Sequence, residues 1–246
     1  MMHRRIIHLS QTDSTNRYLH DLKSEGEDMT VVVAYYQTAG KGQGSNSWES
    51  EAGKNLLMSI RVQPTMVPPN KQFILSEAGA LAVGEALATY TDGISLKWPN
   101  DIYWHDRKIS GTLIQTAVST QGLTSCIFGI GINVNQQAFH SDAPNPVSLW
   151  QILGREVPVE EVMLRVLDAL DRELAHVWAE EFTVVRERYH QHLYRREGFY
   201  PYQDASGKFM AEIVCVENDG HLVLRDIHSC QRQYAFKEVT FCLLHE

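Results

Sequence analysis

The segment from Cys126 to Asn135 reads CIFGIGINVN, and its alternation limits what the chain can fold into. In a β-strand, alternate side chains share one face of the sheet. The apolar residues at positions 128, 130, 132 and 134 would therefore line one face and bury a core. The opposite face would carry two glycines and two amides, Gly129, Gly131, Asn133 and Asn135. This pattern predicts a sheet with one packed face and one bare face that has a polar end.

The two glycines of this segment allow two interpretations. Glycine inside a strand often marks the close approach of a ligand or of another backbone. A flat molecule with a polar edge could lie against Gly129 and Gly131. Alternatively, the glycines leave room for a bulky neighbouring side chain. The residues of the segment alone leave both interpretations open.

The rest of the first three quarters of the chain mixes strand and helix patterns. Strand-like runs occur at 6–9, 30–37, 56–62, 95–98, 101–104 and 108–116. A helix should follow the N-cap residues at 12–16, and the breaker-free stretch Phe73–Tyr90 predicts a buried helix. Pro158 suits the first turn of a helix, and one or two helices should run on to about Tyr194. This mixture predicts an α+β domain over residues 1–193.

The sequence changes character from about Arg196. Short alternating runs follow one another there, and Asn218-Asp219-Gly220 between two of them is a hairpin signal. About fifty residues of short strands and tight turns are typical of a small β-barrel. We therefore expect a second, all-β domain over residues 194–246.

Composition excludes several classes of protein. The chain has 30 acidic against 22 basic residues and a net charge of −8, whereas nucleic-acid-binding proteins normally show a basic stripe. No run of residues approaches the ~18 apolar positions that cross a bilayer, and the N-terminus carries no secretion signal. Hydrophobic residues make up 43%, which is enough to bury a core. These features predict a globular, cytoplasmic protein that binds neither DNA nor membranes.

The four cysteines are Cys126, Cys215, Cys230 and Cys242, and they form neither a CxxC pair nor a zinc-like spacing. We expect reduced and mostly buried thiols, with a disulfide among the last three as the alternative. Serine-hydrolase and zinc-protease motifs are also missing from the sequence.

A loop rich in glycine runs from Gln37 to Trp48, with Lys41 as its only charge. It matches neither a Rossmann fingerprint nor a Walker loop, because it leads into another strand. Its backbone amides, together with Lys41, could wrap an anion. The alternative is an ordinary solvent-exposed loop between strands.

Two further segments carry lysines, and the first of them also carries a carboxylate. In Lys97-Trp98-Pro99-Asn100-Asp101, the carboxylate could hold Mg²⁺ bound to a nucleotide, although a simple turn at Asn100-Asp101 is the better interpretation from these residues alone. Lys108 opens an apolar strand and would either snorkel at the sheet edge or point into a cleft. Strict alternation places Lys108 and Gly111 on opposite faces, so a shared ligand would require a bend or a bulge.

Taken in order, these segments resemble the biotin protein ligases. The resemblance rests on Ser14-Thr15-Asn16, Gln37 with its Gly40-Lys41-Gly42 loop, the segment 97–101, Lys108-Ile109-Ser110-Gly111 and Gly129-Ile130-Gly131-Ile132-Asn133. The tail is similar to the small SH3-like C-terminal domain of that family. The resemblance implies a mixed-sheet catalytic domain of the biotin/lipoate ligase type followed by this β domain.

The activity that the resemblance implies has two steps. The biotin carboxylate attacks the α-phosphate of ATP, with Mg²⁺ as cofactor, and gives biotinyl-5′-AMP and pyrophosphate. A lysine of a biotin carboxyl carrier domain then attacks the mixed anhydride, and AMP leaves. The sequence leaves a homodimer open.

The resemblance also implies roles for individual residues. Lys108 and Lys41 would be catalytic, and Asp101 would meet Mg²⁺ through the nucleotide. Biotin would be bound by Ser14, Thr15, Asn16, Gln37, Gly40, Lys41, Gly42, Gln43, Lys108, Gly111, Gly129 and Gly131. ATP and the adenylate would be bound by Lys41, Trp48, Lys97, Asn100, Asp101, Lys108 and Asn133.

The chain departs from the family in two respects. In many members the loop reads Gly-Arg-Gly-Arg-Arg-Gly-Arg, whereas the only charge of this loop is Lys41. A lysine lacks the bidentate fork of arginine. Pyrophosphate contacts should therefore be looser or come from elsewhere, with Arg107 and Lys97 as candidates. The chain also begins directly at the catalytic domain, so we expect no operator-binding role.

A lipoate–protein ligase or lipoyl transferase remains the alternative enzyme. A catalytically silent biotin-binding module is the other alternative, against which Lys41 and Lys108 argue.

Overall fold

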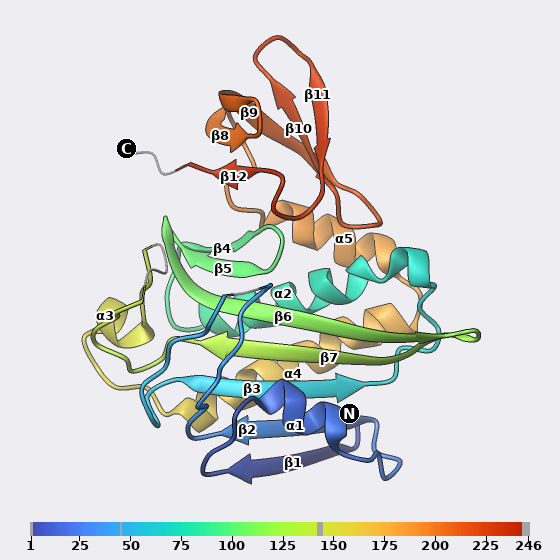
Figure 1. Ribbon diagram of the computed structural model, residues 1–246, viewed down its shortest axis with the longest axis vertical. Coiled ribbons are helices and arrows are strands. Elements are labelled where there is room, and N and C mark those ends of the chain that lie inside the picture. The colour runs from blue at the N-terminus through green and yellow to red at the C-terminus, as the bar shows by residue number, and fades with distance from the viewer. Residues whose placement is uncertain (1, 45, 142–144, 243–246) are drawn as a thin grey trace.

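A computed structural model describes residues 2–44, 46–141 and 145–242 of the chain, and these form two β-sheets (Figure 1). The first sheet has seven strands in the order β1-β2-β3-β7-β6-β5-β4. Only β1 and β2 pair in parallel, so the sheet is mixed as predicted. Its strands are β1 Arg4–Leu9, β2 Met29–Ala34, β3 Leu56–Val62, β4 Ile94–Lys97, β5 Asp101–Trp104, β6 Arg107–Ser119 and β7 Gly122–Ile132.

Helices cover one face of this sheet, and the other face is only partly covered (Figure 1). A Cβ placed on Gly79 of α2 would lie 2.9 Å from the Phe128 ring, which puts α2 on the apolar face of β7. A Cβ placed on Gly129 would instead lie 2.1 Å from Oδ1 of Asn16 in α1, on the opposite face. The helices are α1 Thr15–Asp21, α2 Phe73–Ala88, α3 Leu149–Leu153, α4 Val159–Trp178 and α5 Phe182–Gln191, with a 3₁₀ turn η1 at Pro69–Lys71.

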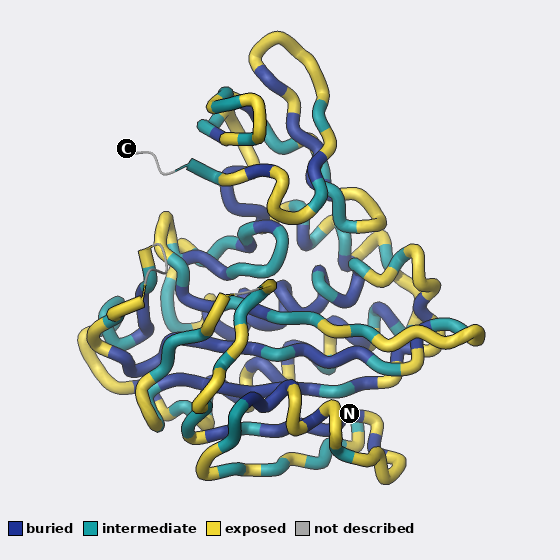
Figure 2. Tube along the Cα trace, viewed as in Figure 1, coloured by how far each residue is buried: buried dark blue, intermediate teal, exposed yellow. Residues whose placement is uncertain are grey.

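Apolar packing explains why the central strands are buried on both sides (Figure 2). On β2, Val31 belongs to the large core beneath the helices, whereas the neighbouring Val32 packs with Leu19 of α1 and Ile127 of β7. Both valines are fully buried, in agreement with a β-branched run that has no polar face. The small cluster beneath α1 covers only part of its face. The glycine end of β7 therefore meets a helix only at Gly129, where Asn16 of α1 lies over the strand.

The second sheet is antiparallel, with five strands in the order β11-β10-β9-β8-β12. The predicted hairpin forms between β9 and β10, where Glu217 N donates to His221 O at 2.8 Å and Gly220 has φ +92°. The chain leaving α5 pairs with β4 of the first sheet, because Tyr194 N donates to Leu96 O at 2.8 Å. The strands are β8 Tyr200–Asp204, β9 Gly207–Val216, β10 Leu222–Asp226, β11 Gln231–Tyr234 and β12 Thr240–Phe241.

The predicted α+β class is confirmed, while some details differ. The sequence patterns did not indicate α3 or β8. The four cysteines are free thiols, but only Cys126 is buried, so the expectation of mostly buried thiols is wrong. Within the described ranges, no helix combines the length and apolarity needed to span a membrane.

Candidate active site

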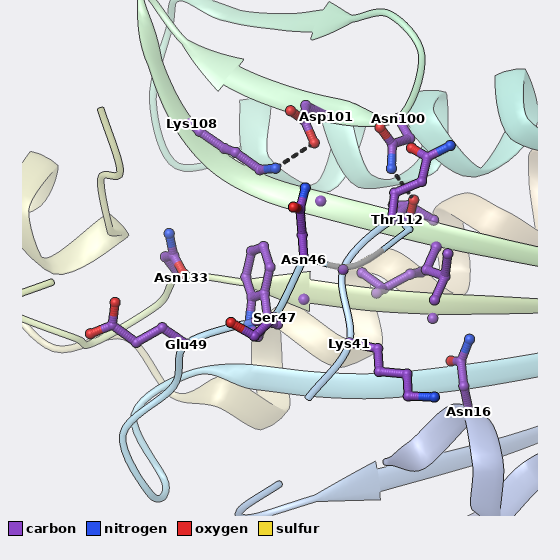
Figure 3. A pocket seen from close by; sticks show the side chains of 18 of the residues that line it. Asn16, Lys41, Asn46, Ser47, Glu49, Asn100, Asp101, Lys108, Thr112 and Asn133 are labelled. Atoms are coloured by element: carbon purple, nitrogen blue, oxygen red, sulfur yellow. Dashed lines mark hydrogen bonds and ion pairs between the residues drawn. The ribbon is translucent and has the colours of Figure 1, made fainter. Parts of the chain in front are cut away.

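A pocket of about 700 Å³ opens on the sheet face that carries α1 (Figure 3). The glycine loop, the start of α1 and the ends of β5, β6 and β7 surround it, and Phe236 reaches it from the loop between β11 and β12. Every residue that the resemblance assigned to biotin or to the nucleotide lines this pocket except Gly40. Gly40 lies at the base of the loop, where its carbonyl accepts Trp48 N at 3.0 Å.

One end of the pocket is a buried and interlocked polar cluster. Ser14 is the N-cap of α1, so the first residues of the helix, Thr15 and Asn16, turn toward the sheet. Gln37 Oε1 accepts hydrogen bonds from Thr15 N at 2.7 Å and from Thr15 Oγ1 at 3.0 Å. Ser59 Oγ lies 2.7 Å from Thr15 Oγ1 and is also hydrogen-bonded to Asn16 Oδ1. These side chains hold one another in place, which preorganises the cluster.

Ser59 was not predicted as a site residue. It lies on β3, is fully buried and stands behind Thr15 and Asn16 rather than in the pocket lining. A signal was present, because it is the only uncharged polar residue in the strand Leu-Leu-Met-Ser-Ile-Arg-Val. A buried hydroxyl requires a hydrogen-bond partner.

The other end of the pocket carries charge. Asp101 Oδ1 lies 2.6 Å from Lys108 Nζ, and Asp101 Oδ2 lies 3.8 Å from Lys97 Nζ. Lys97 is also held between the Tyr103 and Phe241 rings, at 5.1 and 4.9 Å from their centres. Burial lowers the pKa of Lys97, while the Asp101 carboxylate opposes that shift. One carboxylate thus lies between two ammonium groups beside the pocket, and Figure 3 shows its pair with Lys108.

A β-bulge brings Lys108 to the same face as Gly111. Asp101 pairs with Gly111 and Ile102 with Ser110, but the next residue of β5, Tyr103, pairs with Lys108. Ile109 is therefore the extra residue, and strict alternation fails at this point. A Cβ on Gly111 would lie 3.3 Å from Lys108 Nζ. The bend that a shared ligand requires is present.

The glycine loop folds back on itself as a short hairpin over the pocket. Lys41 and Ser47 form an antiparallel bridge, and Gly42 N donates to Asn46 O at 2.8 Å. The base of the loop is tied to the segment before α1, because Ala39 N donates to Asp13 O at 2.9 Å. Among the described residues, no carboxylate lies within 4 Å of Lys41 Nζ. The loop thus presents an uncompensated cation at the pocket.

Both interpretations of the bare strand have a counterpart in the structure. Gly129 and Gly131 line the pocket, as a ligand-binding role requires. The space above them is also limited by neighbouring side chains, Asn16 over Gly129 and the Trp48 indole over Gly131. Gly131 therefore accommodates a bulky residue that is itself part of the pocket wall.

Three buried polar atoms of the pocket have no hydrogen-bond partner within the described part of the chain. They are Gln43 Oε1, Trp48 Nε1 and Thr112 Oγ1. Buried polar groups in native proteins are nearly always paired. A ligand in this pocket would find one acceptor, one donor and one hydroxyl unused.

Other predicted residues also support the local backbone. Asn100 Nδ2 donates to Thr112 O at 2.7 Å, which fits the turn interpretation of Asn100-Asp101. Asn133 Nδ2 donates to Val147 O at 3.1 Å. Of the two candidate replacement cations, Lys97 lines the pocket, whereas Arg107 does not and donates to Pro146 O at 2.8 Å. The expectation for Arg107 therefore finds no support.

Comparison with known proteins agrees with this geometry. Residues 9–133 match the sequence profile of the Biotin/lipoate A/B protein ligase family, and the chain belongs to that family. The Bifunctional ligase/repressor BirA of Bacillus subtilis is 28% identical over 245 residues, covering 96% of this chain and 74% of that protein. The Biotin--[acetyl-CoA-carboxylase] ligase of Mycobacterium tuberculosis is 32% identical over 171 residues, or 65% of this chain and 62% of that one.

Solved structures extend the similarity to the whole fold. The biotin protein ligase from Aquifex aeolicus in complex with biotin and ATP superposes with a TM-score of 0.79 at 27% identity. That superposition covers 96% of this chain and 97% of the other, so both sheets have counterparts in it.

Proposed function

We propose that this chain is a biotin protein ligase, which activates biotin as biotinyl-5′-AMP and transfers it to a lysine of a biotin carboxyl carrier domain. The observation that carries the proposal is the division of one pocket into two ends. A neutral, interlocked polar cluster lies at one end, and the group of Asp101, Lys97 and Lys108 lies at the other. The bare face of β7 connects them.

The neutral end has the chemistry of the biotin head group. A ureido ring offers two N–H donors and one carbonyl acceptor, and hydroxyl and amide side chains can pair with all three. Thr15 and Asn16 are buried and fixed by Gln37 and Ser59, so pairing costs little reorganisation. The dithiolane ring of lipoate offers no such groups and would gain no hydrogen bond from the cluster. This difference favours biotin over lipoate.

The charged end suits acyl-adenylate formation. The biotin carboxylate attacks the α-phosphorus of ATP, one P–O bond forms, and the bond to the pyrophosphate leaving group breaks. Negative charge builds on phosphate oxygens, and the Lys108 ammonium is preorganised to stabilise it. In the second step the carrier amine attacks the acyl carbon, the acyl–phosphate bond breaks, AMP leaves and the amine loses a proton. The glycine hairpin with Trp48 would shield the anhydride from water.

Mg²⁺ fits this site as an ion carried by the nucleotide. Among residues 2–44, 46–141 and 145–242, no three His, Cys, Asp or Glu side chains are grouped so that they could hold a metal ion by themselves. Mg²⁺ in nucleotide sites commonly takes one or two carboxylates together with phosphate oxygens and water. Asp101 would be that carboxylate, and Lys108 and Lys97 hold it beside the pocket.

A transfer assay tests the proposal. The protein is incubated with MgATP, labelled biotin and an apo carrier domain, with and without excess lipoate. We expect biotin on the carrier lysine and little effect of lipoate. Transfer of lipoate without biotin would identify a lipoate ligase instead. Biotin binding without release of AMP would support the catalytically silent module.

A further inference from the structure

The loop between β11 and β12 meets the glycine loop at the mouth of the pocket. In Figure 1 the loop of residues 235–239 in the second sheet approaches the loop between β2 and β3. Phe236 lines the pocket. A Cβ built on Gly44 would lie 2.3 Å from Nζ of Lys237, so the ammonium directly contacts the hairpin. Residues almost two hundred positions apart thus meet beside the pocket.

Lys237 does not itself line the pocket but lies next to Phe236, which does, and its charge is free to bind an anion. Lys97 and Lys108 both face Asp101, which offsets part of their charge. Lys237 has no carboxylate within 4 Å among the described residues, and besides Gly44 its ammonium lies 5.8 Å from the centre of the Phe236 ring. The adjacent carboxylate, Glu238, instead accepts a hydrogen bond from Ala235 N at 2.7 Å. The ammonium of Lys237 is therefore not neutralised by its own domain.

The backbone at Lys237 is a second, independent observation. Its φ is +72°, a left-handed conformation that L-residues with a Cβ adopt at a cost. Such conformations occur mainly where the surrounding structure requires them, often at functional sites. Here the conformation belongs to the turn that directs the side chain toward Gly44.

We propose that Lys237 binds the β- and γ-phosphates of ATP and supplies a cation that the glycine loop lacks. The inference rests on the proposed function, in which a triphosphate enters this pocket. Lys108 lies on the sheet with Asp101, where the α-phosphate would react. Lys237 instead lies beside the glycine loop, next to Phe236 of the pocket lining, and would meet the outer phosphates. The second sheet then completes the nucleotide site rather than merely packing against it.

The test compares substitutions at Lys237 with a matched lysine. Lys237→Ala and Lys237→Gly remove the charge, and the glycine variant also removes the backbone strain. Lys237→Arg keeps the charge. Lys208→Ala on β9 is the control, because Lys208 is an exposed lysine of the same sheet outside the pocket. The measurements are the KM for ATP and kcat of biotin-dependent pyrophosphate release, together with calorimetric binding of ATP and of AMP.

We expect the KM for ATP to rise about 5- to 20-fold in the alanine and glycine variants, since a charge-assisted contact is lost. Arginine should restore it, and Lys208→Ala should match the wild type. AMP binding should stay unchanged in all variants, because AMP lacks the outer phosphates. An unchanged KM for ATP, or equal weakening of ATP and AMP, would overturn the role of Lys237. Wild-type protein without biotin-dependent pyrophosphate release would instead refute the proposed function, and ATP-against-AMP calorimetry would still test Lys237.

Discussion

The Trp48 indole lies on a floor made by two glycines, Gly111 and Gly131, that pair with each other across β6 and β7. A Cβ on Gly131 would lie 2.4 Å from Trp48 Cε2, and one on Gly111 would lie 3.2 Å from Cζ3. Lys108 Nζ is 5.9 Å from the centre of the same ring. Because neither glycine has a side chain, the Trp48 indole at the end of the glycine loop can lie directly on β6 and β7. The position of the indole is also coupled to that of Lys108.

This seating predicts the effect of Gly131→Ala. A methyl group at position 131 would overlap the Trp48 indole, so the indole must move to make room for it. We expect the free energy of unfolding to fall by about 1–3 kcal/mol, as for other overpacked sites, and the KM for ATP to rise. The first quantity is measured by urea unfolding and the second by pyrophosphate release.

A double-mutant cycle checks the cause of that effect. In a Trp48→Ala background the added methyl group has room, so Gly131→Ala should cost less than half as much stability there. Equal costs in the two backgrounds would show that the indole is not what excludes a side chain at position 131.

Lys108→Ala should cripple adenylation without unfolding the protein. The side chain is partly exposed, and Asp101 keeps Lys97 as a partner. Loss of one preorganised donor to a developing charge commonly reduces kcat by 10²- to 10³-fold, so we expect at least about a 100-fold decrease in biotin-dependent pyrophosphate release. Lys54→Ala is the control, because Lys54 forms an exposed pair with Glu156. A wild-type rate in Lys108→Ala would refute the role of Lys108.

Ser59→Ala should affect biotin more than ATP. Ser59 lies behind Thr15 and Asn16 and orients both, so its loss leaves Asn16 Oδ1 without its partner and Thr15 Oγ1 with Gln37 alone. We expect the KM for biotin to rise about 10-fold, which corresponds to about 1.4 kcal/mol of binding free energy, with the KM for ATP nearly unchanged. If both constants rise together, Ser59 supports the whole domain rather than the neutral end of the pocket.

Glu77 predicts a pH dependence of stability. It lies on α2 with no exposed surface, and burial raises its pKa to about 7, although Arg186 Nε at 3.5 Å opposes the shift. A carboxyl with a raised folded-state pKa stabilises the protein fully below its unfolded pKa of about 4.5. That contribution, of about 3 kcal/mol, is lost as the pH rises through 7.

Urea unfolding between pH 4.5 and 8 measures this contribution. The Glu77→Gln variant should lack the decline that the wild type shows, whereas Glu160→Gln at an exposed position of α4 should keep it. A wild type with the same pH profile as Glu77→Gln would contradict the shifted pKa.

The sequence alone was most informative where periodicity and burial coincide. Within β7, the alternation in Cys126–Asn135 correctly separated a packed face, which meets α2, from a face that meets Asn16 and Trp48. The strand ends at Ile132, however, and Asn135 is buried with Nδ2 donating to Val157 O at 2.8 Å, so its predicted place on the bare face is wrong. The run at Thr30–Gln37 contains β2, which ends at Ala34, and the stretch Phe73–Tyr90 contains α2, which ends at Ala88, because uninterrupted apolar burial needs no long-range information.

The rest depends on contacts between distant residues. The bulge at Ile109 arises from the pairing of β5 with β6, so alternation along β6 alone placed Lys108 on the opposite face from Gly111. Ser59 gains its role from α1, more than forty positions earlier. Phe236 reaches the pocket, and Lys237 reaches the glycine loop, only because the second sheet docks there. Local propensity contains none of these relationships.

The most direct measurement of the central claim is the formation of biotinyl-5′-AMP by the protein in a single turnover without any carrier. The protein is mixed with biotin and MgATP, quenched, and the small molecules are identified by mass. We predict one biotinyl-5′-AMP and one pyrophosphate per active site, with no adenylate when lipoate replaces biotin. ATP and biotin that both remain intact, with no adenylate in the protein-bound or free fraction, would contradict the account.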